Sequence, residues 1–84
     1  MRLTDISELT VRDTIGRMPK EFRTKDVSEH PLMRQGHRQF EREASYHALV
    51  GKFLRRLSLG LTPPIRYLSD GGGHPRGALW ARTG

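Results

Sequence analysis

Cysteine is absent from this chain of 84 residues. Without thiols the protein has neither disulfides nor a zinc site built on thiolates, and the composition fits a reducing compartment. A domain of this length buries only about 60% of the surface that its unfolded chain exposes. The sequence therefore predicts a single small domain over residues 1–84 with a thin core.

Long apolar runs and catalytic signatures are also missing. No run approaches the roughly 20 residues that cross a bilayer, and the polar segment MRLTDISELT is unlike a signal peptide. The spacing of the four histidines matches no metal-ligand pattern, and no serine has the surroundings of a nucleophile. We expect no membrane contact, no metal, no cofactor and no enzymatic activity. The expected location is cytoplasmic, in association with the nucleoid.

Acidic side chains are scarce in the second half of the chain. The protein carries 15 Lys and Arg against nine Asp and Glu, a formal net charge of +6. Residues 1–43 are nearly balanced, with nine basic and eight acidic side chains, whereas residues 44–84 hold six basic side chains and one acid, Asp70. A basic small domain favours polyanionic partners. An arginine-rich solvated surface without a partner is the plain alternative.

A first helix is predicted within residues 3–18. Val11, Ile15 and Met18 recur at i, i+4 and i+7, the spacing of one face packed on a core. Thr10, with an acidic residue three positions later, is the expected N-cap.

A short extended segment, residues 21–24, precedes the second predicted helix. Phe22 is expected to point into the core. Thr24 can cap a helix over residues 25–30, and Pro31 disfavours helical geometry at the preceding residue, so we expect it to end this element.

The third helix has the clearest pattern. Residues 32–43 before it show no clean periodicity, which leaves a long connection or an early start of this helix. Over residues 44–58 the apolar side chains form one arc, made of Tyr46, Leu49, Val50, Phe53, Leu54 and Leu57. Gly60 is the expected C-cap, with Leu59 and Leu61 returning apolar contact.

Two short alternating segments, residues 65–68 and 78–82, flank a glycine-rich connection and predict a β-hairpin. An isolated hairpin is marginal in water, so it should pack on the helices or pair with the segment around Phe22 as a third strand. Trp80 is expected to cover the core, and residues 69–77 are expected to be mobile.

This order of elements resembles the winged helix-turn-helix superfamily of DNA-binding regulators. The resemblance rests on FRTKDV (residues 22–27), VGKFLRRLSLGL (residues 50–61) and the hairpin over residues 65–82. It implies an α+β fold of three helices with a two- or three-stranded antiparallel wing. The segment between the second and third helices is longer and more charged here than the usual tight turn of that superfamily.

The resemblance implies a small transcriptional regulator that binds double-stranded DNA. The third helix would enter the major groove, and the 69–77 wing would contact the backbone or minor groove. Lys52 and Arg55 could reach a guanine edge or a phosphate, and Arg76 could enter a narrow minor groove. The full set of candidate DNA contacts is Ser45, His47, Ala48, Lys52, Arg55, Arg56, Arg66, His74 and Arg76.

Two other functions stay open from the sequence. A protein-interaction module could dock through the mixed acidic and basic first half. An RNA-binding protein could use the basic face together with Tyr67 and Trp80. DNA binding as a monomer and as a homodimer formed through the first helix are both compatible with the sequence.

Overall fold

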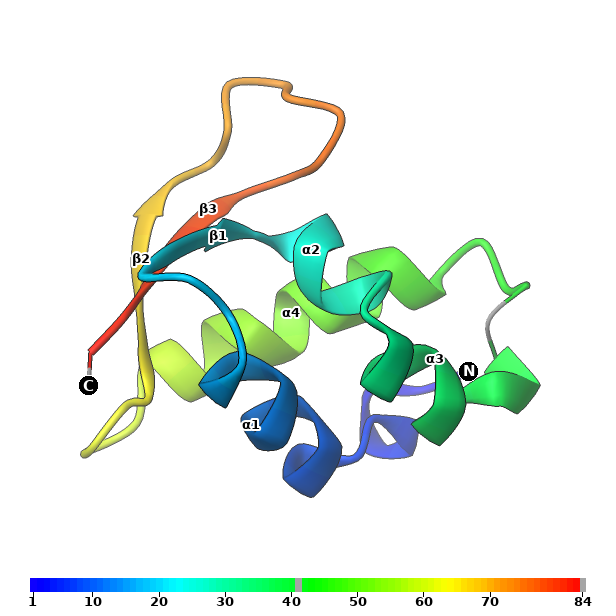
Figure 1. The fold of residues 1–84 in the computed structure, drawn as a ribbon. Coiled ribbons are helices and arrows are strands. Elements are labelled where there is room, and N and C mark those ends of the chain that lie inside the picture. The colour runs from blue at the N-terminus through cyan, green and yellow to red at the C-terminus, as the bar shows by residue number, and fades with distance from the viewer. Residues whose placement is uncertain (41, 84) are drawn as a thin grey trace.

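Four α-helices, two short 3₁₀ helices and a three-stranded antiparallel sheet form the described part of the chain, residues 1–40 and 42–83 of a computed structural model (Figure 1). The helical elements are η1 (Leu3–Asp5), α1 (Glu8–Gly16), α2 (Thr24–Ser28), α3 (Pro31–Gly36), η2 (Arg38–Phe40) and α4 (Tyr46–Ser58). The strands are β1 (Glu21–Arg23), β2 (Ile65–Ser69) and β3 (Leu79–Arg82). The predicted α+β class is confirmed, with four helices where three were expected.

Helix α1 begins one turn before the predicted cap. The side chain of Ser7 accepts a hydrogen bond from the backbone N–H of Thr10 at 3.3 Å, so Ser7 is the N-cap and Thr10 lies inside the helix. The prediction of Thr10 as cap was wrong because Ser7 already supplies an oxygen to the first turn. Val11 and Ile15 are buried as predicted.

Helix α2 follows β1 without a loop, and Thr24 is its first residue rather than its cap. The carboxylate of Asp26 accepts a hydrogen bond from the backbone N–H of Arg23 at 2.8 Å, which ties the helix start to the strand end. The hydroxyl of Thr24 instead accepts a hydrogen bond from the indole nitrogen of Trp80. Phe22 is buried, as predicted, and Val27 of α2 is buried as well.

Helix α3 occupies a segment that the sequence left without a clear structure. Pro31 does not simply end the preceding element; it is the first residue of α3, where its missing N–H has no intrahelical partner to lose. Met33 is fully buried on this helix. His37, just after it, receives the backbone N–H of Ser7 on Nε2 at 2.9 Å and bonds the carbonyl of Met33 through Nδ1 at 3.0 Å. His37 therefore joins α3 to the start of α1 by one hydrogen bond at each ring nitrogen.

The third strand that the sequence left open is present, and β3 lies between β1 and β2. Phe22, Trp80 and Tyr67 lie opposite one another across the three strands and share one face of the sheet. The register of β2 shifts between Tyr67 and Ser69, leaving Leu68 at an irregularity of the ladder. Figure 1 shows the hairpin loop, residues 70–78, projecting from the end of β2 and β3.

One core joins the helices to the sheet. Its largest fully buried side chains include Trp80, Met33, Leu54 and Ile65, and Phe40 packs at its border. Among the described residues no helix is long and apolar enough to cross a membrane.

The end of α4 differs from the sequence-based prediction. Leu59, and not Gly60, occupies the C-cap position. Leu59 and Leu61 do not return to the core: their exposed fractions are 77% and 103%. The expectation of apolar contact there was wrong, since the chain leaves the helix directly toward Pro63 and Pro64 at the start of β2.

Candidate functional site

The solvent-facing side of α4 is cationic. Ala48, Lys52 and Arg55 recur at i, i+4 and i+7, so they share one side of the helix, and all three are exposed. The other side buries Tyr46, Val50, Phe53, Leu54 and Leu57. No Asp or Glu occurs within α4, and Lys52 forms no ion pair with any residue in the described part of the chain. This side can therefore meet an anionic partner without first releasing a carboxylate.

The hairpin and α4 together enclose a groove of about 260 Å³. Its α4 wall is made of His47, Ala48, Gly51, Lys52 and Arg55. The opposite wall is made of Thr24, Tyr67, Asp70, Gly77, Ala78 and Trp80. The polar side of α4 and the base of the hairpin loop thus open onto one hollow.

A tyrosine orders the rim of this groove. The guanidinium carbon of Arg55 lies 5.3 Å from the ring centroid of Tyr67, a cation–π contact. The hydroxyl of Tyr67 donates a hydrogen bond to the carboxylate of Asp70, which raises the pKa of Tyr67. The Tyr67 ring meets Trp80 edge-on, with centroids 5.4 Å apart. Asp70 is thereby held at the rim opposite Lys52 and reduces the positive charge on the hairpin side.

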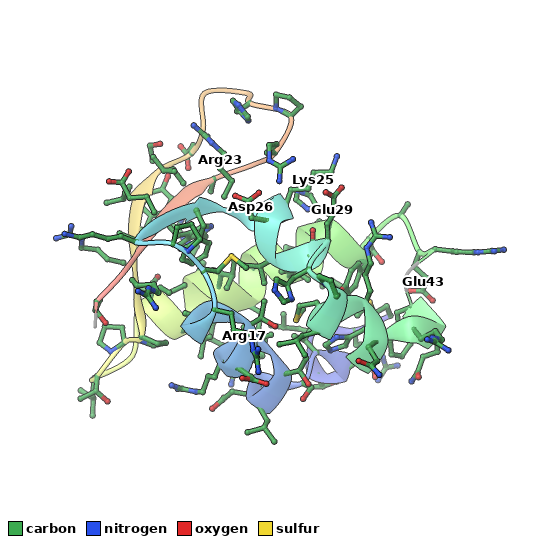
Figure 2. The ribbon with its side chains drawn as sticks, viewed as in Figure 1. Arg17, Arg23, Lys25, Asp26, Glu29 and Glu43 are labelled. Atoms are coloured by element: carbon green, nitrogen blue, oxygen red, sulfur yellow. The ribbon has the colours of Figure 1, made fainter. Side chains whose placement is uncertain are left out.

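The hairpin loop is bound to the first turn of α2. The guanidinium of Arg76 pairs with the carboxylate of Asp26, and the guanidinium of Arg23 donates to the carbonyl of Gly77 at 3.1 Å. The backbone N–H of Lys25 donates to the carbonyl of Arg76 at 3.0 Å. Figure 2 shows Arg23, Lys25 and Asp26 close together beneath the loop. Arg76, a candidate for the minor groove, is therefore held by Asp26 in this structure.

The ion pair with Arg76 affects the pKa of the Asp26 carboxyl. Burial alone would raise the pKa of this carboxyl. The hydrogen bond from the Arg23 amide and the neighbouring Arg76 guanidinium outweigh burial, so the pKa of Asp26 lies below its ordinary value. Asp26 is thus ionised at neutral pH, and the hairpin loop stays anchored to α2.

His47 stands where α2, α4 and the hairpin loop meet. Its Nδ1 lies 3.1 Å from the hydroxyl oxygen of Ser28. A Cβ placed on Gly77 would lie 3.3 Å from its Nε2, so a side chain there would crowd the ring. Desolvation, followed by the positive charge of Lys25, lowers the pKa of His47. The ring is therefore neutral at pH 7 and is half-buried.

The remaining candidates lie outside the groove. Ser45 is exposed at the N-cap position of α4, where its side chain caps no backbone amide, and Arg56 is exposed on the same helix. Arg66 is paired across the sheet with Ala81, on the face opposite Tyr67. His74 accepts a hydrogen bond from the backbone N–H of Arg76 at 3.1 Å within the loop. Of the candidates on α4 and the hairpin, the structure gathers His47, Ala48, Lys52 and Arg55 around one hollow.

A second cavity, of about 400 Å³, is also lined by His47. It is lined by Lys25, Ser28, Glu29, Arg34, Arg42, Glu43, Ala44, Tyr46 and His47. Figure 2 labels three of these side chains: Lys25 on α2, Glu29 at the C-cap position just after α2, and Glu43 on the segment before α4. Sequence reasoning missed this cavity because α3, which contributes Arg34, was not predicted. The only available signal was the density of charge over residues 32–43.

Within residues 1–40 and 42–83 no three His, Asp or Glu side chains gather as a metal site would require. Comparison of the chain with protein-family models, with curated proteins and with solved structures gives no match.

Proposed function

We propose that this chain binds double-stranded DNA as a small winged-helix protein. In this proposal α4 enters the major groove, and the hairpin acts as the wing, contacting the backbone or the minor groove. The observation that supports it most is the common groove. The acid-free side of α4, with Lys52 and Arg55, borders the same hollow as the base of the hairpin loop.

The side chains on α4 suit the contacts that such a helix makes. The major groove is about 12 Å wide and admits an α-helix. Ala48 is small and exposed, so a base edge can approach the helix backbone closely. Lys52 and Arg55 extend from the same side and carry the donors that guanine edges and phosphates accept. The role that we propose for such a protein is regulation of transcription.

To bind DNA through the wing, Arg76 would exchange its contact with Asp26 for a contact with a phosphate. Arg76 is paired with Asp26, so a phosphate must displace that carboxylate to bind the guanidinium. The pair is partly exposed, with side-chain exposed fractions of 44% for Arg76 and 32% for Asp26. An exposed ion pair stabilises by at most about 1 kcal/mol, which a backbone phosphate can replace.

Fluorescence anisotropy with a labelled random duplex of about 20 base pairs tests the proposal. Affinity should fall steeply between about 50 and 200 mM salt, with a slope reflecting roughly five phosphates or more. The double variant Lys52→Gln/Arg55→Gln should weaken binding at least tenfold, since each lost contact to a charged group is worth about 1.5 kcal/mol or more.

The matched control is Arg12→Gln/Arg17→Gln, which removes the same charge from α1 and its C-cap residue Arg17. Arg12 pairs with Glu8, and Arg17 pairs with Asp13, and neither arginine lines the groove. Binding should change little in this control. Equal losses in the two double variants, or no binding of duplex by the wild type, would count against the proposal, and stronger competition by a structured RNA hairpin would favour RNA.

A second candidate function is contact with protein, including a second copy of this chain. Leu59 and Leu61 favour it because both are largely exposed, and contiguous exposed apolar side chains mark interaction surfaces. Sedimentation equilibrium at rising protein concentration, comparing the wild type with Leu61→Ser, measures self-association through this turn.

A further inference from the structure

We propose that the cavity between α2, α3 and the start of α4 is a phosphate-binding site, in which Arg34 and Arg42 bind a phosphate of the nucleic-acid backbone. This inference rests on the proposed DNA-binding function and extends it to residues outside α4 and the hairpin. It also assigns a role to α3, the helix that the winged-helix pattern does not predict.

The two arginines come from different segments and face one hollow. Arg34 belongs to α3 and Arg42 to the segment before α4, and both line the cavity of about 400 Å³. Both side chains are exposed. In the described part of the chain neither arginine forms an ion pair. Their charges are therefore available to an anion from solvent.

The acids that line the cavity are already paired. Glu29 lies 3.6 Å from the ammonium of Lys25, and Glu43 lies 3.0 Å from the amino group of Met1. These pairs leave the charges of Arg34 and Arg42 without a counterion in the cavity wall. The cavity therefore favours an anion over a cation or a neutral ligand.

The guanidinium of arginine matches the geometry of a phosphate group better than the ammonium of lysine does. The planar guanidinium offers parallel N–H donors that match two phosphate oxygens. Two guanidinium groups on one hollow can bind different oxygens of the same tetrahedral group. Ser28 lines the same wall, but its one hydroxyl proton is donated to the carbonyl of Lys25 at 3.3 Å, so the proposed contacts to phosphate come from the two arginines.

Position links this cavity to the groove. His47 lines both hollows, so the cavity and the groove are neighbours. A duplex seated on the exposed side of α4 would present backbone on both sides of the helix. One strand would lie near the hairpin, and the other near Arg34 and Arg42.

The test compares Arg34→Gln/Arg42→Gln with the control Arg12→Gln/Arg38→Gln, which removes two charges from residues that line neither hollow. Thermal unfolding by circular dichroism should be nearly unchanged in both. With the labelled duplex, the first variant should lose roughly tenfold in affinity and its salt slope should shrink by about one, the value for one phosphate. The control should keep the wild-type slope. An unchanged affinity and slope in Arg34→Gln/Arg42→Gln would overturn the assignment to the DNA backbone.

A second measurement separates this inference from the proposed function. Inorganic pyrophosphate is titrated into the wild type, and backbone amide shifts are followed by NMR. Shifts at Lys25, Arg34 and His47 that vanish in Arg34→Gln/Arg42→Gln would establish the phosphate site even if duplex DNA does not bind, and would then assign it to a free phosphate compound. Absence of both these shifts and the duplex effect would overturn the phosphate site altogether.

Discussion

The indole nitrogen of Trp80 donates a hydrogen bond of 2.9 Å to the hydroxyl oxygen of Thr24 in the interior of the protein. This bond joins the central strand to the first turn of α2, beside the groove. Both side chains are buried, with exposed fractions of 2% and 3%. Replacing Thr24 by Val should leave the indole donor without a partner and lower the free energy of unfolding by about 1–3 kcal/mol.

Denaturant unfolding of a double-mutant cycle checks this value. In a Trp80→Phe background the donor is gone, so Thr24→Val should cost about 1 kcal/mol less than it does in the wild type. Additive costs would show that Thr24 contributes through packing alone, with its methyl group beside Gly51.

The pair of Asp26 and Arg76 should make the anchoring of the hairpin dependent on pH. The pKa of Asp26 is lowered in the folded state, so its contribution to stability is present above the unfolded carboxyl pKa of about 3.9. It is lost as the pH falls from there through the lower pKa of the folded protein. At pH 7 Asp26→Asn should cost roughly 0.2–1 kcal/mol, the range for exposed pairs. Unfolding of wild type and variant at pH 7 and at a pH below the folded pKa of Asp26 measures the difference, which should disappear in acid; an equal difference at both values would contradict the assignment.

His47 should report occupation of the groove. Its pKa is lowered in the free protein, so the imidazole favours folding in its neutral form. The stability that this provides is present above the unfolded pKa of about 6.5 and is lost as the pH falls toward the lower folded pKa. A phosphate close to the ring favours the charged form, so duplex DNA should raise the pKa of His47. An NMR titration of the imidazole protons with and without duplex measures this; His47→Gln should lack the destabilisation below pH ~6.5. A pKa unmoved by saturating duplex would place the DNA away from His47.

Two adjacent glycines of the hairpin loop should differ in their tolerance of a side chain. Gly71 has φ +83°, and an added Cβ would lie 2.4 Å from the carbonyl oxygen of Gly77. Gly72 has φ +53° and open space around it. Gly72→Ala should cost about 1 kcal/mol, the penalty of the left-handed region. Gly71→Ala should cost more, because the backbone of the loop must also move; thermal unfolding of the two variants compares them, and equal melting temperatures would contradict the close approach of Gly71 to Gly77.

Apolar periodicity predicted the packed face of α4, with Val50, Phe53 and Leu54, and the hairpin. The burial of Phe22 and Trp80 was expected from residue type, since aromatic side chains anchor the packing of a thin core. The third strand was one of two alternatives, and the structure selects it.

Features that depend on contacts between distant residues were not predicted. Thr24 is a reasonable cap by residue type, but Trp80, 56 positions later, engages its hydroxyl. Helix α3 has weak local signals because one residue, Met33, supplies its fully buried contact. For the site, sequence reasoning identified the exposed side of α4. It did not foresee that Asp26 holds Arg76, nor that Arg34 and Arg42 share a cavity, since both depend on tertiary packing.

The place of β3 between β1 and β2 has a consequence for how the protein is made. When residues 1–78 have been synthesised, the chain contains both outer strands, β1 and β2. The central strand β3, with which each of them pairs, has not yet been made. The sheet can assemble only after Arg82 has been added, and its pairing with residues 21–23 then closes a span of about 60 residues. Until that moment the aromatic side chain of Phe22 lacks its cover, so the nascent chain depends on its helices to stay soluble.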